Sequence, residues 1–269
     1  MSIRFGVIAT PRGDARAWAA QVAAFEAAGW DTVLVPDTLW TTSPFPALAA
    51  AAAATTRLRL RPWVLAAPFR TPGALVREAS ALHELSGGRF ELGIGTGRPD
   101  AEGEATRLGV AWGSAGERVA ALERAVTAVR DAVSPPPPIA VAASGPRMLA
   151  LAGRVADRVA PALPPAADET ALAAAVHAVR AAATGRAAPP GVTQAIVGVG
   201  DHLPARLEQH GLDAATLAAQ GAVGLVPADP SALAALLRER QQRYGIDEYV
   251  VAEELAATLA RTVAHLAAV

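Results

Sequence analysis

The strongest constraint on the fold is an alternation of short β-rich runs with longer helical patterns along the 269 residues. In 15–28, for example, Trp18, Val22 and Phe25 recur at helical spacing. Strands that alternate with helices are typical of parallel βα units. The predicted strands are 3–9, 31–35, 58–65, 89–94, 139–143, 157–160, 194–199 and 248–251. Eight such units in a chain of this length predict an α/β fold with one domain, 1–269, built as a (β/α)8 TIM barrel.

One segment interrupts the alternation. The polar, glycine-bearing stretch 98–116 separates the fourth strand from the helix predicted at 117–133. We therefore expect an inserted loop after strand 4. Because the loops that follow the strands carry the functional site in barrels of this type, candidate site residues are expected at the C-terminal ends of the strands.

Composition excludes several chemistries. All 24 basic residues are arginine, so no lysine amine is present for Schiff-base catalysis. The absence of cysteine excludes disulfides, thiolate catalysis and cysteine-ligated metal. A net charge of −1 without a basic block argues against nucleic-acid binding. No apolar stretch reaches the roughly 18 residues of a membrane span, and no signal-peptide pattern begins the chain. We expect a cytoplasmic protein with neither nucleic-acid nor membrane partners.

The histidines do not suggest a metal site. None of the five pairs with another at metal-ligand spacing, so no metal is predicted. They are His83, His177, His202, His210 and His265. Of these, His202 follows the seventh strand and is placed to reach the barrel mouth; a solvated loop histidine is the alternative.

Two glycine clusters flank the fourth predicted strand. Ser86-Gly87-Gly88 ends the preceding helix, as glycine does when the chain turns through the left-handed region. Gly95-Thr96-Gly97 follows the strand, where glycine lets a flat ligand approach the backbone closely. A ligand site is therefore predicted at this strand end.

Three phrases carry a family resemblance: LSGGRFELGIGTG at 85–97, VPD at 35–37 and the turn Ser144-Gly145-Pro146. Together they resemble the luciferase-like monooxygenase superfamily, and within it the F420-dependent oxidoreductases. The resemblance implies a TIM barrel, a homodimer, and hydride transfer between the deazaflavin coenzyme F420 and a small organic substrate at the barrel mouth. Two alternatives stay open: an FMN-dependent monooxygenase of the same fold, and a paralogue that binds a cofactor without turnover.

The resemblance also suggests catalytic positions. The family commonly has an Asp-His pair at the end of strand 2, and here Asp37 is followed by Thr38, which cannot exchange protons near neutral pH. Trp40 would stack on the ring or line the substrate pocket. Arg98 stands where some sugar-phosphate dehydrogenases of the family have a catalytic glutamate, so the charge is reversed here. A positive charge at this position fits an anionic substrate or cofactor tail. The alternatives are that Asp37 caps the next segment and that Trp40 belongs to the core.

The same resemblance assigns cofactor contacts to five strand ends. Leu65 and Ala66 lie in the family's bulge behind the ring, where a cis non-proline peptide is often found; a simple strand end before a loop is the alternative. Ser144 and Arg147 lie at the family's phosphate site, where a helix N-terminus and a guanidinium fork suit an anion; an ordinary N-cap is the alternative. The full set of expected cofactor residues is Ala9, Asp37, Leu65, Ala66, Gly95, Thr96, Gly97, Ala143, Ser144, Gly145 and Arg147.

Some residues of the inserted loop and of the helix that follows it are expected to have a structural role. Glu104, Gly109 and Arg118 match a family phrase and are expected to hold the loop in place. Phe69 and Trp112, with Trp40, favour a partly hydrophobic substrate over a sugar phosphate. The identity of that substrate does not follow from the sequence.

Overall fold

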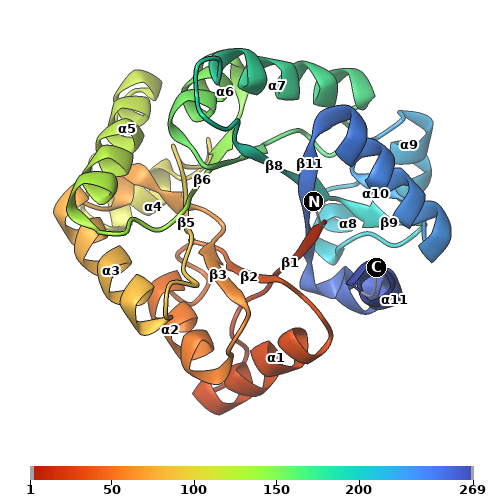
Figure 1. Ribbon diagram of the computed structural model, residues 1–269, viewed down its shortest axis with the longest axis horizontal. Helices are drawn as coiled ribbons and strands as arrows, with labels where there is room; N and C mark the ends of the chain where they lie inside the picture. The colour runs from red at the N-terminus through yellow and green to blue at the C-terminus, as the bar shows by residue number, and fades with distance from the viewer. Residues whose placement is uncertain (1–2, 268–269) are drawn as a thin grey trace.

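The computed structural model describes residues 3–267 and forms a closed barrel of parallel strands surrounded by helices (Figure 1). The main sheet has nine strands in the order β3-β2-β1-β11-β8-β7-β6-β5-β4. These are β1 (Arg4–Ile8), β2 (Thr32–Val35), β3 (Arg59–Pro62), β4 (Leu65–Ala66), β5 (Leu92–Gly95), β6 (Ile139–Ala143), β7 (Arg158–Pro161), β8 (Gly191–Ile196) and β11 (Ile246–Ala252). The ring closes between β3 and the start of β5, where the Leu60 N–H donates to the Arg89 carbonyl at 3.2 Å and Leu60 accepts from Glu91 at 2.9 Å.

The TIM barrel predicted from the alternation is confirmed, because β3 and β4 are two halves of one strand and the nine segments make an eight-strand ring. The chain bends between these halves, and the peptide bond joining Trp63 to Val64 is cis. The sixth predicted strand corresponds to β7, which pairs in parallel with β6 and β8.

Helices pack outside the strands and complete each βα unit. They are α1 (Ala15–Ala27), α2 (Pro44–Ala54), α3 (Pro72–Leu85), α4 (Glu102–Arg107), α5 (Ala115–Ala132), α6 (Gly145–Val155), α7 (Glu169–Ala182), α8 (Ala205–Gln209), α9 (Ala214–Ala219), α10 (Pro230–Tyr244) and α11 (Ala256–Ala267), with the 3-10 turns η1 (Ala67–Phe69) and η2 (Glu253–Leu255). Side-chain caps begin several of them; Asp14, for example, accepts from the N–H groups of Arg16 and Ala17.

The principal core lies between the strands and the helices. Alternate strand residues such as Phe5, Val33 and Tyr249 are buried in it. The Trp18 indole joins α1 to α2 by donating to the Ala47 carbonyl at 2.8 Å. Burial of this apolar layer fixes which strand residues face outward, so the intervening residues must face the barrel lumen.

Two segments differ from the sequence prediction. The seventh strand, expected at 194–199, is β8 at Gly191–Ile196, and the chain then leaves the barrel. Its next residues form β9 (Gly198–Val199), which pairs with β10 (Leu225–Val226) in a separate two-stranded sheet. The Val197 N–H donates to the Gly224 carbonyl at 2.7 Å, so hydrogen bonding to the 221–226 segment redirects the strand. The 98–116 insertion also contains a short helix, α4.

None of the described helices is both long and apolar enough to cross a membrane.

Candidate functional site

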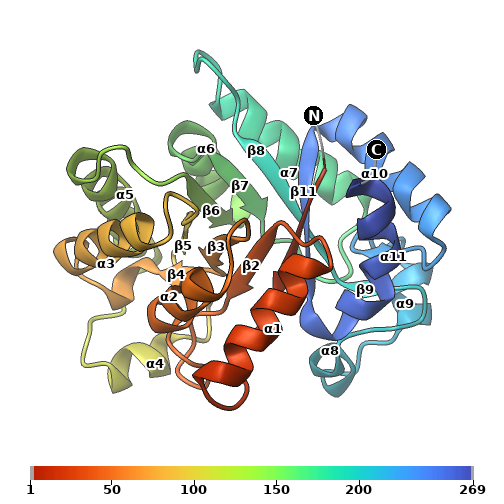
Figure 2. The same cartoon turned by 60° about the horizontal axis from the view of Figure 1, so that its bottom comes forward.

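The C-terminal ends of the barrel strands meet at one end of the barrel, here called the mouth. In Figure 2 the chain enters β1 from the top, so the mouth lies toward the bottom, where α4 and α8 are found. Alternation along the strands assigns small or uncharged residues to the lumen near the mouth: Ile8, Pro36, Val64, Gly95, Ala142, Ala160, Ala195 and Ala252. Ala195 is solvent-exposed although it lies within a barrel strand. Solvent therefore reaches the lumen from this end.

The opposite end of the lumen, here called the floor, is filled by charged side chains. Arg61 is fully buried and donates to Glu248 from Nη1 at 2.8 Å and to Glu91 from Nε at 2.8 Å. Arg4 and Arg158 contact the same carboxylates, at 3.2 Å and 3.6 Å from Glu248. Floor residues such as these stabilise the barrel, whereas the mouth is the end that binds ligands.

The floor carboxylates are held ionised by their partners. Burial alone raises the pKa of Glu248, but the charge of Arg61 and its hydrogen bonds outweigh burial, so the pKa lies below its ordinary value. For Glu91, too, burial acts to raise the pKa, and the charges of Arg61 and Arg4 lower it further than burial raises it. Burial disfavours the charged Arg61, yet Glu248 and Glu91 raise its pKa overall.

Asp37 lies at the end of β2 and is fully engaged. Arg70 donates to both of its carboxylate oxygens, at 2.6 Å and 2.9 Å, and the Ala66 N–H donates to Oδ2 at 3.2 Å. Asp37 does not cap α2, whose N-cap residue is Ser43 and makes no side-chain cap hydrogen bond. Its contacts instead join β2 to the β4–η1 corner. The geometry favours a positioning role for Asp37 at the mouth.

Thr38 is half-buried, and its hydroxyl lies 2.8 Å from the Thr41 hydroxyl. Thr41 Oγ1 also lies within hydrogen-bond distance of the Pro36 and Thr38 carbonyls, at 3.3 Å and 3.2 Å. The Thr38 side chain therefore closes a local turn in the β2–α2 loop.

Trp40 and Arg98 come together, although they lie on different loops. The Arg98 guanidinium lies 4.8 Å from the centre of the Trp40 ring, a cation–π contact. Trp40 is 66% exposed, so its assignment to the core is wrong. Arg98 also pairs with Asp100 at 3.2 Å and with the buried carboxylate of Glu104. The sequence suggested that Arg98 offers its charge to an anion; in the structure two carboxylates already balance it.

Glu104 connects the inserted loop to the mouth. In addition to Arg98, it accepts a hydrogen bond from the Leu39 N–H at 2.8 Å. Arg118 donates to the Gly113 carbonyl at 2.8 Å and lies 4.5 Å from the Trp112 ring. The structural roles expected for Glu104 and Arg118 agree with these contacts, and Gly109 has the positive φ of +67° that suits glycine.

The Gly95-Thr96-Gly97 cluster ends β5 at the mouth. Val64 and Ala142 are the neighbours of Gly95, and a Cβ here would lie 3.0 Å from the Val64 side chain and in ordinary contact with Ala142. Gly97 has a φ of +86°, and a Cβ on it would overlap the Trp112 ring. Thr96 is half-buried, and its hydroxyl has no hydrogen-bond partner in the described part of the chain. Glycine at 95 keeps the backbone open, whereas glycine at 97 makes room for the protein's own tryptophan.

Phe69 and Trp112 pack together with their ring centres 5.9 Å apart. Because Trp112 is seated on Gly97 and Arg118, these rings hold the insertion against η1. Their expected role in substrate contact is not supported by this packing.

Three expected cofactor residues present backbone rather than side chain to the mouth. Leu65, Ala9 and Ala143 have side chains in the helix–strand core, at 1%, 2% and 2% exposure. Ala66 lies next to Gly97, on the lumen side. At Ala9 and Ala143, ligand contact is therefore open only to backbone atoms, and Ala142 is the lumen-facing residue of β6.

The N-terminus of α6 is exposed at the mouth. Ser144 is its N-cap but makes no side-chain cap hydrogen bond, and Gly145 follows with a φ of +71°. Both are exposed, as is Arg147. Within residues 3–267, Arg147 has no hydrogen-bond or ion-pair partner. A free hydroxyl, a free guanidinium and unpaired helix N–H groups form a set of donors suited to an anion.

The histidines contribute little to this site. His202 is 66% exposed, and its Nδ1 lies 2.7 Å from the neighbouring Asp201 carboxylate, which fits the solvated loop alternative. The His265 side chain lies outside the described residues. Among the side chains that are described, no group of three or more His, Cys, Asp or Glu residues could hold a metal ion.

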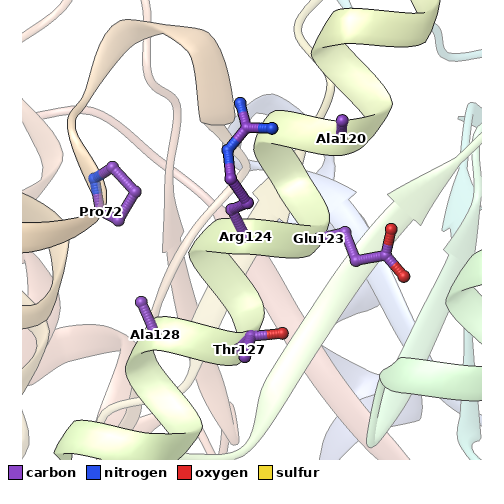
Figure 3. Close-up of a pocket in the computed structure, with 6 residues that line it drawn as sticks. All are labelled: Pro72, Ala120, Glu123, Arg124, Thr127 and Ala128. Carbon is purple, nitrogen blue, oxygen red and sulfur yellow. The ribbon is translucent and has the colours of Figure 1, made fainter.

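The surface grooves lie outside the lumen. An open groove of about 580 Å³ runs along α5, with Arg124 beside the start of α3 at Pro72 and Glu123 pointing away from it (Figure 3). A second, of about 260 Å³, lies between η1 and Trp112. Neither includes Gly95 or the α6 N-terminus, so they are separate from the candidate site.

Sequence reasoning missed two sets of partners. Arg70 pairs with Asp37, and no local pattern links residues 33 positions apart. The floor residues had a readable signal: in Arg59-Leu60-Arg61 arginine alternates with leucine within a predicted strand, which places charge on one face. Glu91 and Glu248 likewise interrupt apolar runs.

The chain matches the sequence profile of the luciferase-like monooxygenases over residues 2–264, and it therefore belongs to that family. An F420-dependent glucose-6-phosphate dehydrogenase of Beutenbergia cavernae is 35% identical over 164 residues, and the match covers 49% of this chain and 48% of that protein. The chain spans about half the length of the curated relatives it matches.

Solved structures share the barrel. A riboflavin lyase bound to modified FMN and riboflavin aligns with a TM-score of 0.76 at 15% identity, over 99% of this chain and 91% of that one. An F420-dependent secondary alcohol dehydrogenase with an F420–acetone adduct aligns with a TM-score of 0.73, also at 15% identity, over 99% of both chains. At such identity these likenesses concern the fold alone.

Proposed function

We propose that this protein is an oxidoreductase that transfers a hydride between the deazaflavin coenzyme F420 and a small organic substrate held at the barrel mouth. The observation that carries the proposal is the exposed N-terminus of α6, where the donors of Ser144 and Arg147 are unused. Relatives named as F420-dependent dehydrogenases support the choice of cofactor.

The donor set at α6 fits the phosphate of such a cofactor. A phosphate accepts hydrogen bonds from helix N–H groups and is favoured by the positive end of the helix dipole. Arg147 adds a planar fork of N–H donors that matches phosphate oxygens. Ser144 adds a hydroxyl that no cap bond occupies.

The lumen beside α6 fits the ring of such a cofactor. Gly95 leaves the β5 backbone open, and the neighbouring Ala142 and Val64 are uncharged. When bound, F420 accepts or donates a hydride; the chain's part is to orient the two reactants and limit the access of water. Leu65 and Ala66 follow the bend at Trp63–Val64, whose position Asp37 fixes through the Ala66 N–H.

The mouth residues proposed as catalytic then act mainly by orientation. Both oxygens of Asp37 are bound by Arg70, so proton transfer at this carboxylate would first require Arg70 to move. The Thr38 hydroxyl is neutral and forms a hydrogen bond with the Thr41 hydroxyl. Trp40 and Arg98 form the outer rim, where the substrate enters.

An FMN-dependent monooxygenase is the second candidate, because a neighbour in fold is bound to modified FMN. The third, a paralogue that binds a cofactor without turnover, is suggested by Thr38 in the position of the usual histidine.

Titration with F420 and, separately, with FMN distinguishes these candidates, by fluorescence quenching or calorimetry. Micromolar binding of F420 with much weaker binding of FMN is the expected result. Tight binding of FMN alone would favour the monooxygenase, and binding of F420 without turnover of any substrate would favour the paralogue. If neither cofactor binds, the proposal is wrong.

A matched pair of variants tests the α6 site. Loss of a charged hydrogen bond costs about 1.5 kcal/mol or more, so Arg147→Gln should weaken F420 binding by about tenfold or more. Arg154→Gln makes the same charge change in the last turn of the same helix and should not alter F420 affinity. Equal affinities for the two variants would remove Arg147 from the site.

We further expect a homodimer in solution. Light scattering on the purified protein measures its mass directly, and a monomer would contradict the expectation.

A further inference from the structure

Three segments of the mouth meet at one buried carboxylate, Glu104. Its side chain is 7% exposed, although it lies in the polar insertion that follows β5. Oε2 accepts a hydrogen bond from the Leu39 N–H at 2.8 Å, and Oε1 accepts one from the Arg98 guanidinium. A buried charge is costly unless it is paired and hydrogen-bonded, and here each oxygen has such a partner. Glu104 on α4 therefore joins the β2–α2 loop to the segment that follows β5.

The helix that carries Glu104 is itself fixed against the protein. Ala101 and Ala105, which lie before and after Glu104, are each 1% exposed. The Val110 N–H donates to the Ala105 carbonyl at 3.0 Å and ties the chain after α4 back to the helix. In Figure 2, α4 lies at the mouth end of the barrel. Because α4 is anchored by its buried side, the loop and the guanidinium are the parts that Glu104 holds in place.

Glu104 fixes Trp40 in two ways. It binds the N–H of Leu39, the residue directly before Trp40, and so holds the backbone of the loop. It also binds Arg98, whose guanidinium lies 4.8 Å from the centre of the Trp40 ring in a cation–π contact. Trp40 is 66% exposed, so packing of its own side chain against the protein holds it only weakly. The position of the indole therefore depends on Glu104.

A second carboxylate, Asp100, provides the comparison. It lies 3.2 Å from the Arg98 guanidinium, but its side chain is 71% exposed, against 7% for Glu104. Water and salt screen an exposed ion pair, whereas a buried pair interacts more strongly at the same distance. Of the two carboxylates that contact Arg98, Glu104 should therefore determine where the guanidinium lies.

We propose that Glu104 is a positioning residue that holds Trp40 and Arg98 over one side of the mouth, where they shield the ring of the bound cofactor from solvent; this inference rests on the proposed function. Exclusion of water strengthens the electrostatic interactions in a site and prevents side reactions of a reactive intermediate. Both oxygens of Glu104 are occupied by Leu39 and Arg98, so Glu104 acts through these groups rather than on the substrate.

The first test needs no cofactor. Trp40 is one of five tryptophans, and labelling with fluorotryptophan gives each a fluorine resonance; that of Trp40 is identified by its loss in Trp40→Phe. In Glu104→Gln the amide oxygen can still accept from the Leu39 N–H, but the charge that holds Arg98 is gone. We expect the Trp40 resonance to move towards its position in the unfolded protein while the other resonances stay. Asp100→Asn removes one negative charge from the same guanidinium and should shift the resonance severalfold less. Equal shifts would contradict the proposal.

A second variant breaks the same connection from its other side. Arg98→Gln removes the guanidinium that contacts the Trp40 ring, and it keeps the proposal testable if Glu104→Gln does not fold. The Trp40 resonance should shift in the same direction as in Glu104→Gln. The double variant should shift it no further, because the two residues act in one chain of contacts. A double-variant shift equal to the sum of the two single shifts would overturn the proposal.

The second test measures the shielding of bound F420. The fluorescence of the F420 complex is quenched with TEMPOL, a neutral collisional quencher whose approach does not depend on the charge of the variant. The quenching constant should rise severalfold in Glu104→Gln and in Trp40→Ala, and it should stay close to the wild-type value in Asp100→Asn. Bound F420 that is quenched equally in the wild type and in Glu104→Gln overturns the inference alone. Failure to bind F420 overturns the proposed function, and the fluorine measurement still tests the positioning of Trp40.

Thermal unfolding separates positioning from stability. A role in stability alone would lower the melting temperature of Glu104→Gln and leave both the Trp40 resonance and the quenching constant unchanged below that temperature. That result would contradict the proposal. A shifted resonance and a raised quenching constant, measured where the variant is fully folded, support it.

Discussion

The two ends of the barrel lumen differ in the charge and the pairing of their side chains. At the floor, Arg61, Glu91 and Glu248 are buried and bind one another in a network with several contacts per group. At the mouth, the lumen-facing side chains are uncharged, and the free donors of Ser144 and Arg147 lie at the edge. The charged groups of the floor are paired with one another, whereas the donors of Ser144 and Arg147 at the mouth are unused. The same strands carry both ends, so stability and binding are separated along each strand.

The largest effect should follow from breaking the floor. Arg61→Met leaves two buried carboxylates without their shared cation, and removing one partner of a buried pair costs about 3–5 kcal/mol. Arg59 lies two positions away and pairs with the same Glu91, but its side chain is 44% exposed. Arg59→Met should therefore cost less than about 1 kcal/mol. Urea denaturation measures both, and equal costs would mean that the floor is not a buried network.

Acid should be the next most effective way to weaken the floor. Because the pKa values of Glu91 and Glu248 are lowered in the folded state, their stabilisation is fully present above the ordinary glutamate pKa of about 4.3. It is lost as the pH falls from there through the lower folded-state pKa. The contribution of these two carboxylates to the free energy of unfolding should be constant above about pH 5 and should decrease as the pH falls below that value. In Glu248→Gln, the free energy of unfolding should decrease less steeply with acidification than in the wild type. Parallel curves for the two proteins would contradict the link between these pKa values and stability.

At the mouth, Asp37 should show an intermediate effect. Asp37→Ala leaves the Ala66 N–H and the Arg70 guanidinium without their acceptor, which costs about 1–3 kcal/mol. Asp37→Asn separates positioning from catalysis. If Asp37 only positions the β4–η1 corner, the pH dependence of kcat keeps its shape while the rate falls. If the pH dependence of kcat instead lost its acidic or basic limb in Asp37→Asn, Asp37 would have a catalytic role.

The smallest effect on stability should come from Ser144. Its hydroxyl caps no helix N–H, so Ser144→Ala should change the free energy of unfolding by less than about 0.5 kcal/mol. Asp168 is the N-cap of α7 and accepts from the Ala171 N–H at 2.9 Å, so Asp168→Ala should cost about 1 kcal/mol. Ser144→Ala should nevertheless weaken F420 binding. Thermal unfolding and F420 titration of the two variants reveal whether Ser144 serves the helix or a ligand.

The positions of the candidate site residues followed from the sequence, but their states did not. The order of strands and glycine clusters correctly brought Asp37, Gly95 and Arg147 to the mouth. It left open whether Trp40 was core or surface, and the structure exposes it because Glu104 and Arg98 fix the loop outside the barrel. The charge of Arg98 was read as available, since its neighbours Asp100 and Glu104 could be counted but not oriented.

What the sequence alone determined is the alternation of strands and helices, the glycine stops and the strand ends at which a site can form. These depend on local backbone preferences and on apolar spacing within about twenty residues. Only the closed barrel decided which charges neutralise one another, because Arg61 and Glu248 are 187 positions apart and meet when the ring closes. The pairing of Asp37 with Arg70 and the freedom of Arg147 have the same origin. A side chain's partners depend on the full set of neighbours that folding brings within reach, and that set is nonlocal.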